Sequence, residues 1–82
     1  MSSKHQNEHF LAATPEELKA GLLAAVQHRI ARYKSQSAAA RAWGVAQSTV
    51  NEIANGKERC SSQYLIELLL LDGCTLQVVV HD

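Results

Sequence analysis

The stretch QSAAARAWGVAQSTVNEIAN, residues 36–55, decides the fold. It holds two short segments with helical spacing, one on each side of Gly44. Two short helices can pack at a steep angle only where a small side chain lets them approach, and Ala40 supplies that position. Gly44 falls in the turn, where a left-handed backbone conformation costs little only for glycine. The spacing therefore predicts a helix-turn-helix unit.

Apolar residues complete this pattern at the positions that a helix-turn-helix unit must bury. They are Ala39, Trp43, Val45, Val50 and Ile53. A small residue and a glycine at the right spacing are a weak signal alone, but the five apolar positions make the pattern fairly strong. An indole can also stack on a nucleic-acid base, yet the position of Trp43 in the pattern favours the core.

Capping signals divide the chain around this unit into four helices. Hydroxyl residues suited to N-capping precede three of them, at Thr14, Ser35 and Ser61. Glycines suited to turns or left-handed caps follow at Gly44, Gly56 and Gly73. The expected helices cover residues 15–33, 36–43, 47–55 and 62–72.

The two ends of the chain differ from the helical middle. Residues 1–13 show no sustained period, and we expect a mostly disordered, flexible tail. Residues 75–82, TLQVVVHD, alternate like a β-strand, and a strand needs a partner for its backbone groups. The N-terminal tail is a weak candidate, so we expect the partner to be a second copy of the chain. The expected organisation is a tail (1–13), a helix-turn-helix domain (14–73) and a dimerisation strand (74–82) whose contacts are Leu76, Val78 and Val80.

Composition limits the class of protein. The chain has 82 residues, 46% of them hydrophobic, which fits one globular domain of marginal size that oligomerisation would stabilise. It shows no apolar run long enough for a membrane span and no leader-like pattern, so we expect a cytoplasmic protein. Cys60 and Cys74 form no zinc spacing with the four histidines, and neither a metal nor a cofactor is expected. No nucleophile motif is present, and we expect no enzymatic activity.

Charge is unevenly distributed although the net charge is zero. Residues 29–59 carry six Lys and Arg against two Glu, a net charge of +4, whereas both flanks are acidic. A local basic surface is what phosphate binding requires. Arg29 and Arg32 are ambiguous, because cations at the end of a helix also stabilise its dipole.

The segment SQSAAARAWGVAQSTVNEIANGK resembles the Cro/lambda-repressor-like (XRE) helix-turn-helix family, and the likeness extends over residues 18–73. The leucine-rich helix, glycine and C-terminal strand resemble small antitoxin-like regulators of that family. The resemblance implies an all-α fold of four to five helices with a C-terminal strand that pairs across a homodimer. It also implies a repressor that binds a palindromic operator in double-stranded DNA. The alternative is a protein-binding module whose main partner is a toxin or another protein.

The resemblance also assigns the DNA-binding residues. Gln36 and Gln47, at the starts of two helices, would cooperate in holding phosphate and base, and glutamine can bond adenine in two places. The full set of expected DNA contacts is Gln36, Arg41, Gln47, Ser48, Thr49, Asn51, Glu52, Asn55, Lys57 and Arg59. Two positions depart from the family: Ala46 replaces the usual capping Ser or Thr, and Asp72 replaces an apolar residue.

Overall fold

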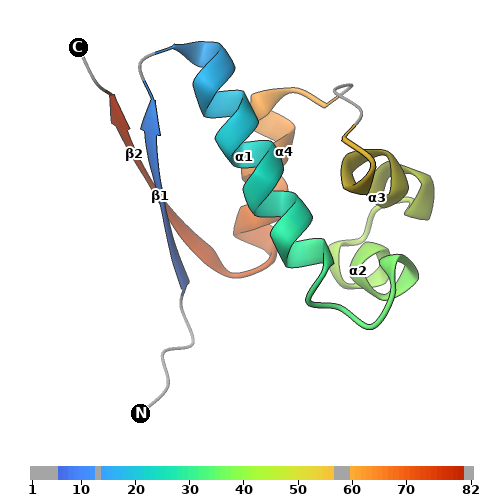
Figure 1. The fold of residues 1–82 in the computed structure, drawn as a ribbon. Coiled ribbons are helices and arrows are strands. Elements are labelled where there is room, and N and C mark those ends of the chain that lie inside the picture. The colour runs from blue at the N-terminus through green and yellow to red at the C-terminus, as the bar shows by residue number, and fades with distance from the viewer. Residues whose placement is uncertain (1–5, 13, 57–59, 81–82) are drawn as a thin grey trace.

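The computed structural model describes residues 6–12, 14–56 and 60–80. In chain order its elements are β1 (Gln6–Ala12), α1 (Pro15–Ile30), α2 (Gln36–Trp43), α3 (Gln47–Ala54), α4 (Ser62–Leu71) and β2 (Cys74–Val80) (Figure 1). The predicted helical class, with four helices followed by a C-terminal strand, is confirmed. The first helix ends at Ile30, earlier than the expected residue 33, and a turn then leads to α2.

The capping residues explain where the helices begin. Thr14 and Glu17 form a complete capping box at α1, with each side chain bonded to the other residue's backbone N–H at 3.2 Å. Ser35 caps α2 by accepting from the N–H of Ala38 at 3.0 Å. Ala46 precedes α3 and makes no side-chain capping bond, which is the weaker start that the sequence predicts.

Gly44 makes the turn between α2 and α3. Its φ is 70° and its ψ is 32°, a left-handed conformation that is costly for residues with a Cβ. The backbone N–H of Val45 then bonds to the carbonyl of Ala40 at 3.0 Å, which satisfies an end group of α2. The turn is therefore closed by the two small residues that the sequence singles out.

The core lies where α1, α4 and the α2–α3 pair meet. Its buried hydrophobic residues are Leu22, Val26, Ile30, Ala39, Ala40, Trp43, Val50, Ile53, Leu65, Leu68, Leu69 and Cys74. Trp43 is 5% exposed, so its predicted place in the core is confirmed. None of the helices in the described ranges has the length and apolar character needed to cross a membrane.

The N-terminal segment differs from the expectation. Residues 6–12 are strand β1, which pairs with β2 in parallel, from Gln6 opposite Cys74 to Ala12 opposite Val80. The expected disordered tail is therefore wrong for residues 6–12, while residues 1–5 and 13 lie outside the described ranges. Backbone pairing needs no apolar period in the added strand, which is why a polar segment gave no signal.

The two-stranded sheet and the α2–α3 pair lie on opposite sides of the α1 and α4 helices (Figure 1). β1 contacts α1, and β2 contacts α4, from which it continues directly. The molecule is flat, with extents of 39 × 37 × 16 Å. The predicted recognition unit and the predicted dimerisation strand are thus separated by the helical body.

Candidate nucleic-acid interface

Helix α3 buries one face and exposes a polar face. Val50 and Ile53 are fully buried against the body. Gln47, Ser48, Asn51 and Asn55 are exposed. Amide and hydroxyl groups can hydrogen-bond base edges and phosphates, so this face offers the chemistry that a major-groove helix requires.

A chain of side-chain amides links this face to the start of α2. The Nδ2 group of Asn51 donates to Oε1 of Gln36 at 3.0 Å. The Nδ2 group of Asn55 donates to Oδ1 of Asn51 at 3.1 Å. The sequence paired Gln36 with Gln47 in function, but the residue that the structure brings to Gln36 is Asn51, one turn further along α3. Gln47 stands beside this chain at the exposed start of the same helix.

Thr49 and Glu52 lie on the flanks of α3 and are half-buried. The thiol of Cys60 has a raised pKa, first because it is buried and second because the Glu52 carboxylate is near it. Glu52 is therefore close enough to Cys60, which precedes α4, to act on that thiol electrostatically.

The cations of the basic segment divide into two groups. Arg29 is 6% exposed and forms an ion pair with Asp72 at 3.5 Å, so it is a core residue and not a DNA contact. Arg32, Lys34 and Arg41 are exposed around the start and the outer side of α2, and Arg41 also donates to the Ser37 hydroxyl at 3.5 Å. Lys57 and Arg59 lie outside the described residues.

Lys34 is a residue that the sequence counted as basic but did not assign to the interface. It is exposed and stands two positions before Gln36, beside the start of α2. A helix start favours anions because its backbone N–H groups point outward, and a neighbouring ammonium group strengthens that preference. The signal was present in the sequence as a lysine next to the capping residue Ser35.

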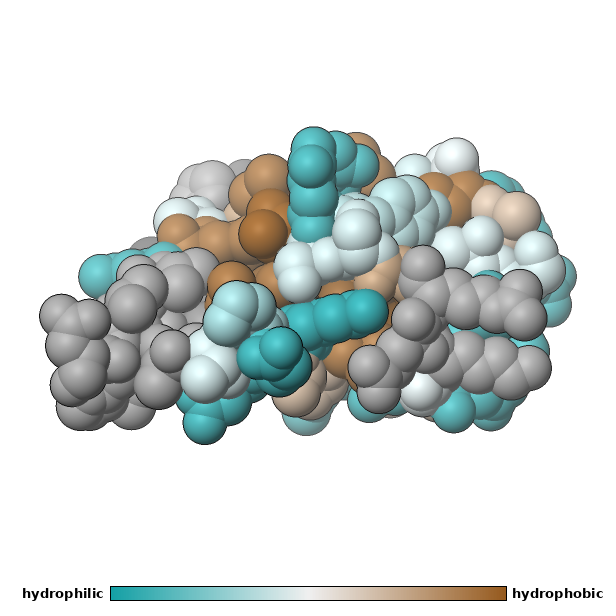
Figure 2. All heavy atoms as spheres, turned by 90° about the horizontal axis from the view of Figure 1, so that it is seen from above, coloured by the Kyte–Doolittle hydropathy of each residue, from teal (hydrophilic) through white to brown (hydrophobic). Residues whose placement is uncertain are grey.

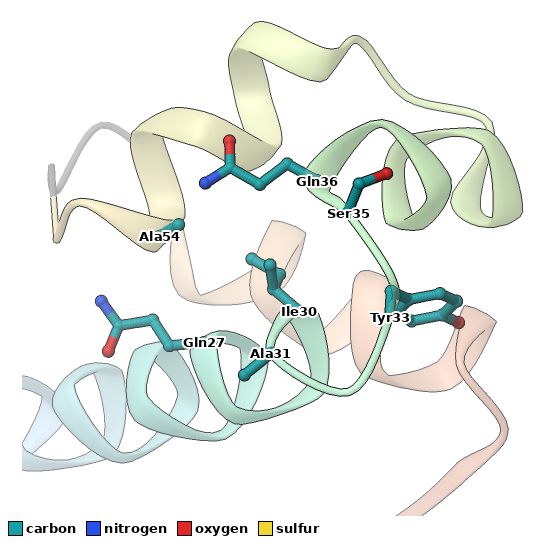
Figure 3. A pocket seen from close by; sticks show the side chains of 7 residues that line it. All are labelled: Gln27, Ile30, Ala31, Tyr33, Ser35, Gln36 and Ala54. Carbon is teal, nitrogen blue, oxygen red and sulfur yellow. The ribbon is translucent and has the colours of Figure 1, made fainter.

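A shallow cleft of about 350 Å³ separates the end of α1 from the α2–α3 pair. Figure 3 shows the Gln27 and Gln36 amides at the end of the cleft near Ala54, and the Tyr33 ring at the other end. The Gln27 amide donates to the carbonyl of Ile53 at 2.9 Å and so ties α1 to α3. Both glutamines are engaged within the protein, and the cleft is lined without a charged side chain.

The face that Figure 2 looks onto mixes hydrophobic and hydrophilic surface. Hydrophilic side chains interrupt the hydrophobic areas, so this face forms no continuous apolar platform. Leu70 and Leu71, at the end of α4, are large hydrophobic side chains that are exposed.

Comparison with known families agrees with this geometry. The chain matches a family described as a helix-turn-helix domain over residues 9–81, nearly its whole length. Comparison with curated proteins and with solved structures gave no significant match. The steep α2–α3 pair, the Gly44 turn and the exposed polar face of α3 are the features that such a domain presents to DNA. The chain therefore belongs to the helix-turn-helix family of DNA-binding regulatory domains.

Proposed function

We propose that this protein is a small Cro/lambda-repressor-like regulator of the antitoxin-like type, which represses transcription by binding a palindromic operator as a homodimer. The observation that carries the proposal is the chain of side-chain amides that runs from Gln36, at the start of α2, through Asn51 to Asn55, at the end of α3. A side chain held by a neighbour loses little further freedom when it contacts a base. This arrangement favours sequence-specific reading over general attraction to DNA.

Base reading falls to the exposed residues of α3. Gln47, Ser48 and Asn51 enter the major groove, where the amides pair with adenine and the hydroxyl serves either bases or phosphates. Thr49, Glu52 and Asn55 lie nearer the groove edges. Gln36 holds Asn51 in place and reaches phosphate from the start of α2.

Phosphate binding falls to the cations of the basic segment. Arg41 and Lys34 flank the start and side of α2, and Lys57 and Arg59 follow α3 in the chain. Each cation that neutralises a phosphate releases a counterion, so the affinity falls as salt rises. A protein with zero net charge can bind DNA in this way because its basic residues are concentrated in residues 29–59.

The proposed dimer forms along the second edge of β2. The sheet has two strands in the described part of the chain, so β1 occupies one edge of β2 and no third strand covers the other. A two-stranded sheet is marginally stable alone, and an open edge favours pairing with another strand. Antiparallel pairing of β2 with its copy across a two-fold axis gives a four-stranded sheet, with Leu76, Val78 and Val80 as the expected contacts.

Exposed leucines at the end of α4 support the same interface. Leu70 and Leu71 are 54% and 60% exposed, and they come just before β2. Large apolar side chains next to an open strand edge are typical of a surface that is covered in an assembly. A second copy placed on the β2 edge would cover both.

This dimer would leave both α3 helices outside the interface. The sheet and the α2–α3 pair lie on opposite sides of the body, so pairing through β2 does not involve the recognition helices (Figure 1). Two helices that read successive major grooves must lie about 34 Å apart. The proposed dimer must present its two α3 helices at that spacing to occupy one palindromic operator.

The decisive experiment is selection of bound sequences from random duplex DNA by the full chain. We expect a palindromic motif with half-sites one helical turn apart, and affinity that falls steeply with salt. Absence of any enriched sequence would overturn the proposed function. Weak salt dependence without preference for duplex would indicate the alternative, a module that docks a toxin or another protein.

The dimer has a separate test. Removal of residues 75–82 should give a monomer in sedimentation equilibrium. The truncated chain should bind the operator with two half-sites more weakly than the intact chain does. A truncated chain that still sediments as a dimer would place the interface elsewhere.

A further inference from the structure

The Asp72 carboxylate, at the end of α4, accepts hydrogen bonds from the side chains of three other residues. Its Oδ1 accepts from the Tyr33 hydroxyl and from the Trp43 indole N–H, the latter at 3.1 Å. Its Oδ2 accepts from the Arg29 guanidinium at 3.5 Å. The Arg29 and Asp72 side chains are only 7% and 12% exposed. Tyr33 and Trp43 also touch edge to face, with ring centroids 5.7 Å apart.

This cluster joins parts of the chain that have different proposed tasks. Asp72 is the C-cap of α4, and Gly73, with φ of 85°, turns the chain directly into β2. Trp43 is the last residue of α2, the first helix of the recognition unit. The bond from Trp43 to Asp72 therefore connects the recognition unit to the point where the proposed dimerisation strand begins.

Besides its buried apolar packing, the α2–α3 unit has hydrogen bonds to the body at two separate places among the described residues. α2 packs chiefly against α3, and α3 packs against α1. Gln27 ties the end of α3 to α1 through the carbonyl of Ile53. Trp43 ties the end of α2 to α4 through Asp72. Apolar packing is not directional, whereas two separated hydrogen bonds restrict the tilt of the unit on the body.

We propose that Asp72 is a positioning residue that fixes the angle between the α2–α3 unit and strand β2, and thereby the distance between the two recognition helices of the dimer. The proposal rests on the proposed function for its DNA consequence. An apolar side chain could fill the space but could not accept the indole N–H of Trp43.

The test compares two variants that each remove one hydrogen bond to the same carboxylate oxygen. Trp43→Phe removes the bond that reaches α2, and Tyr33→Phe removes the bond from the turn after α1. Because Trp43→Phe also shrinks a core side chain, a synthetic chain in which sulfur replaces the indole N–H of Trp43 keeps the ring shape and separates the two effects.

The first measurement is amide hydrogen exchange, which needs no DNA. Losing the indole bond should raise the exchange rates of residues 36–54 by up to about tenfold. The exchange rates in α1 and α4 should change no more than they do in Tyr33→Phe. Equal effects of the two changes throughout the chain would overturn the positioning role. The sulfur-containing chain must behave like Trp43→Phe, and wild-type exchange in it would also overturn the proposal.

The second measurement is competition among operators whose half-sites are moved apart or together by one base pair. The wild type should prefer one spacing, and loss of the indole bond should reduce that preference about fivefold or more while single half-site affinity is kept. An unchanged spacing preference would refute the role of Asp72 even if the wild type binds its operator well. Failure of the wild type to select any operator would refute the proposed function instead, and hydrogen exchange would still decide the mechanical part.

Discussion

Arg29 and Trp43 show how residue type and partner together decide a role. The apolar pattern around Trp43 predicted its burial, and the structure confirms it. Nothing near Arg29 in the sequence predicts its burial, because the partner Asp72 lies 43 positions away. Local periodicity reports which face of a helix is apolar, but it cannot identify a charge pair between two distant helices. The same limit hid the Gln36–Asn51 contact, although both residues were expected at the interface.

Base reading and phosphate binding can be separated at single residues. Gln47→Ala should cost about 1–3 kcal/mol of binding free energy and relax base preference at one position per half-site. Arg41→Ala is the matched control from the same unit, and it should weaken all sequences about equally and lower the salt dependence by about one counterion. Binding titrations against single-base operator variants measure both. If Gln47→Ala left the preference unchanged, another residue would occupy its position in the groove.

Tyr33 should make stability depend on pH in the alkaline range. Burial, and then the hydrogen bond to Asp72 and its negative charge, raise the pKa of Tyr33 above its usual 10.0. The folded protein holds this proton more tightly than the unfolded chain, so the stabilisation is complete below pH 10.0 and declines as the pH rises toward the folded pKa.

Urea unfolding at a series of alkaline pH values measures this dependence. Tyr33→Phe should make the decline shallower without abolishing it, because burial also raises the pKa of Tyr64. A decline of the same slope in Tyr33→Phe and in the wild type would contradict the assignment to Tyr33.

At the scale of helices and strands, the sequence predicted the features that depend on residues close together in the chain. Helix starts followed from caps such as Thr14 and Ser61, whose side chains bond the backbone within three positions. The end of α1 was less certain, because its apolar spacing continues to Tyr33 although the helix stops at Ile30. Tyr33 leaves the helical path and turns to Asp72, so a tertiary contact decides the helix end. Strand β1 was missed because its partner is β2, at the other end of the chain.

The start of α3 offers a stabilising substitution. Ala46 already has the extended backbone of an N-cap, with φ of −70° and ψ of 143°, but lacks a side-chain acceptor. Ala46→Ser should therefore raise the free energy of unfolding by about 1 kcal/mol, as measured by urea denaturation. Ser61→Ala, which removes the bond to the Tyr64 N–H, is the reciprocal control and should lower it by a similar amount. No gain from Ala46→Ser would mean that the first turn of α3 is limited by something other than its cap.

At the scale of the whole molecule, the sheet and the helical body lie in different places, and the sequence predicts them to different extents. The described core residues come mainly from the helices, and Cys74 of β2 also belongs to the core. The helical body could be predicted because its contacts follow from apolar spacing, whereas the sheet joins the two ends of the chain. The strand that the sequence predicts near the C-terminal end is present as Cys74–Val80, while residues 81–82 lie outside the described ranges. The sequence favoured a second copy as its partner, with the N-terminal tail as a weak candidate, whereas the structure pairs it with β1 of the same chain.

Deletion of residues 1–12 tests this division. Removing β1 exposes the inner edge of β2, so the free energy of unfolding should fall by about 2 kcal/mol while the helical circular dichroism signal remains. Deletion of residues 1–5 alone spares β1 and should have little effect. Complete loss of helical signal in the longer deletion would show that the body cannot fold without the sheet.

The pairing of Gln6 with Cys74 also orders events during synthesis. β1 is made before every helix of the body, whereas its partner β2 is made after all of them. A chain that stops before β2 can still contain all four helices, but it leaves β1 unpaired and cannot build the sheet. Chains interrupted before β2 would therefore lack the strand through which the proposed dimer forms.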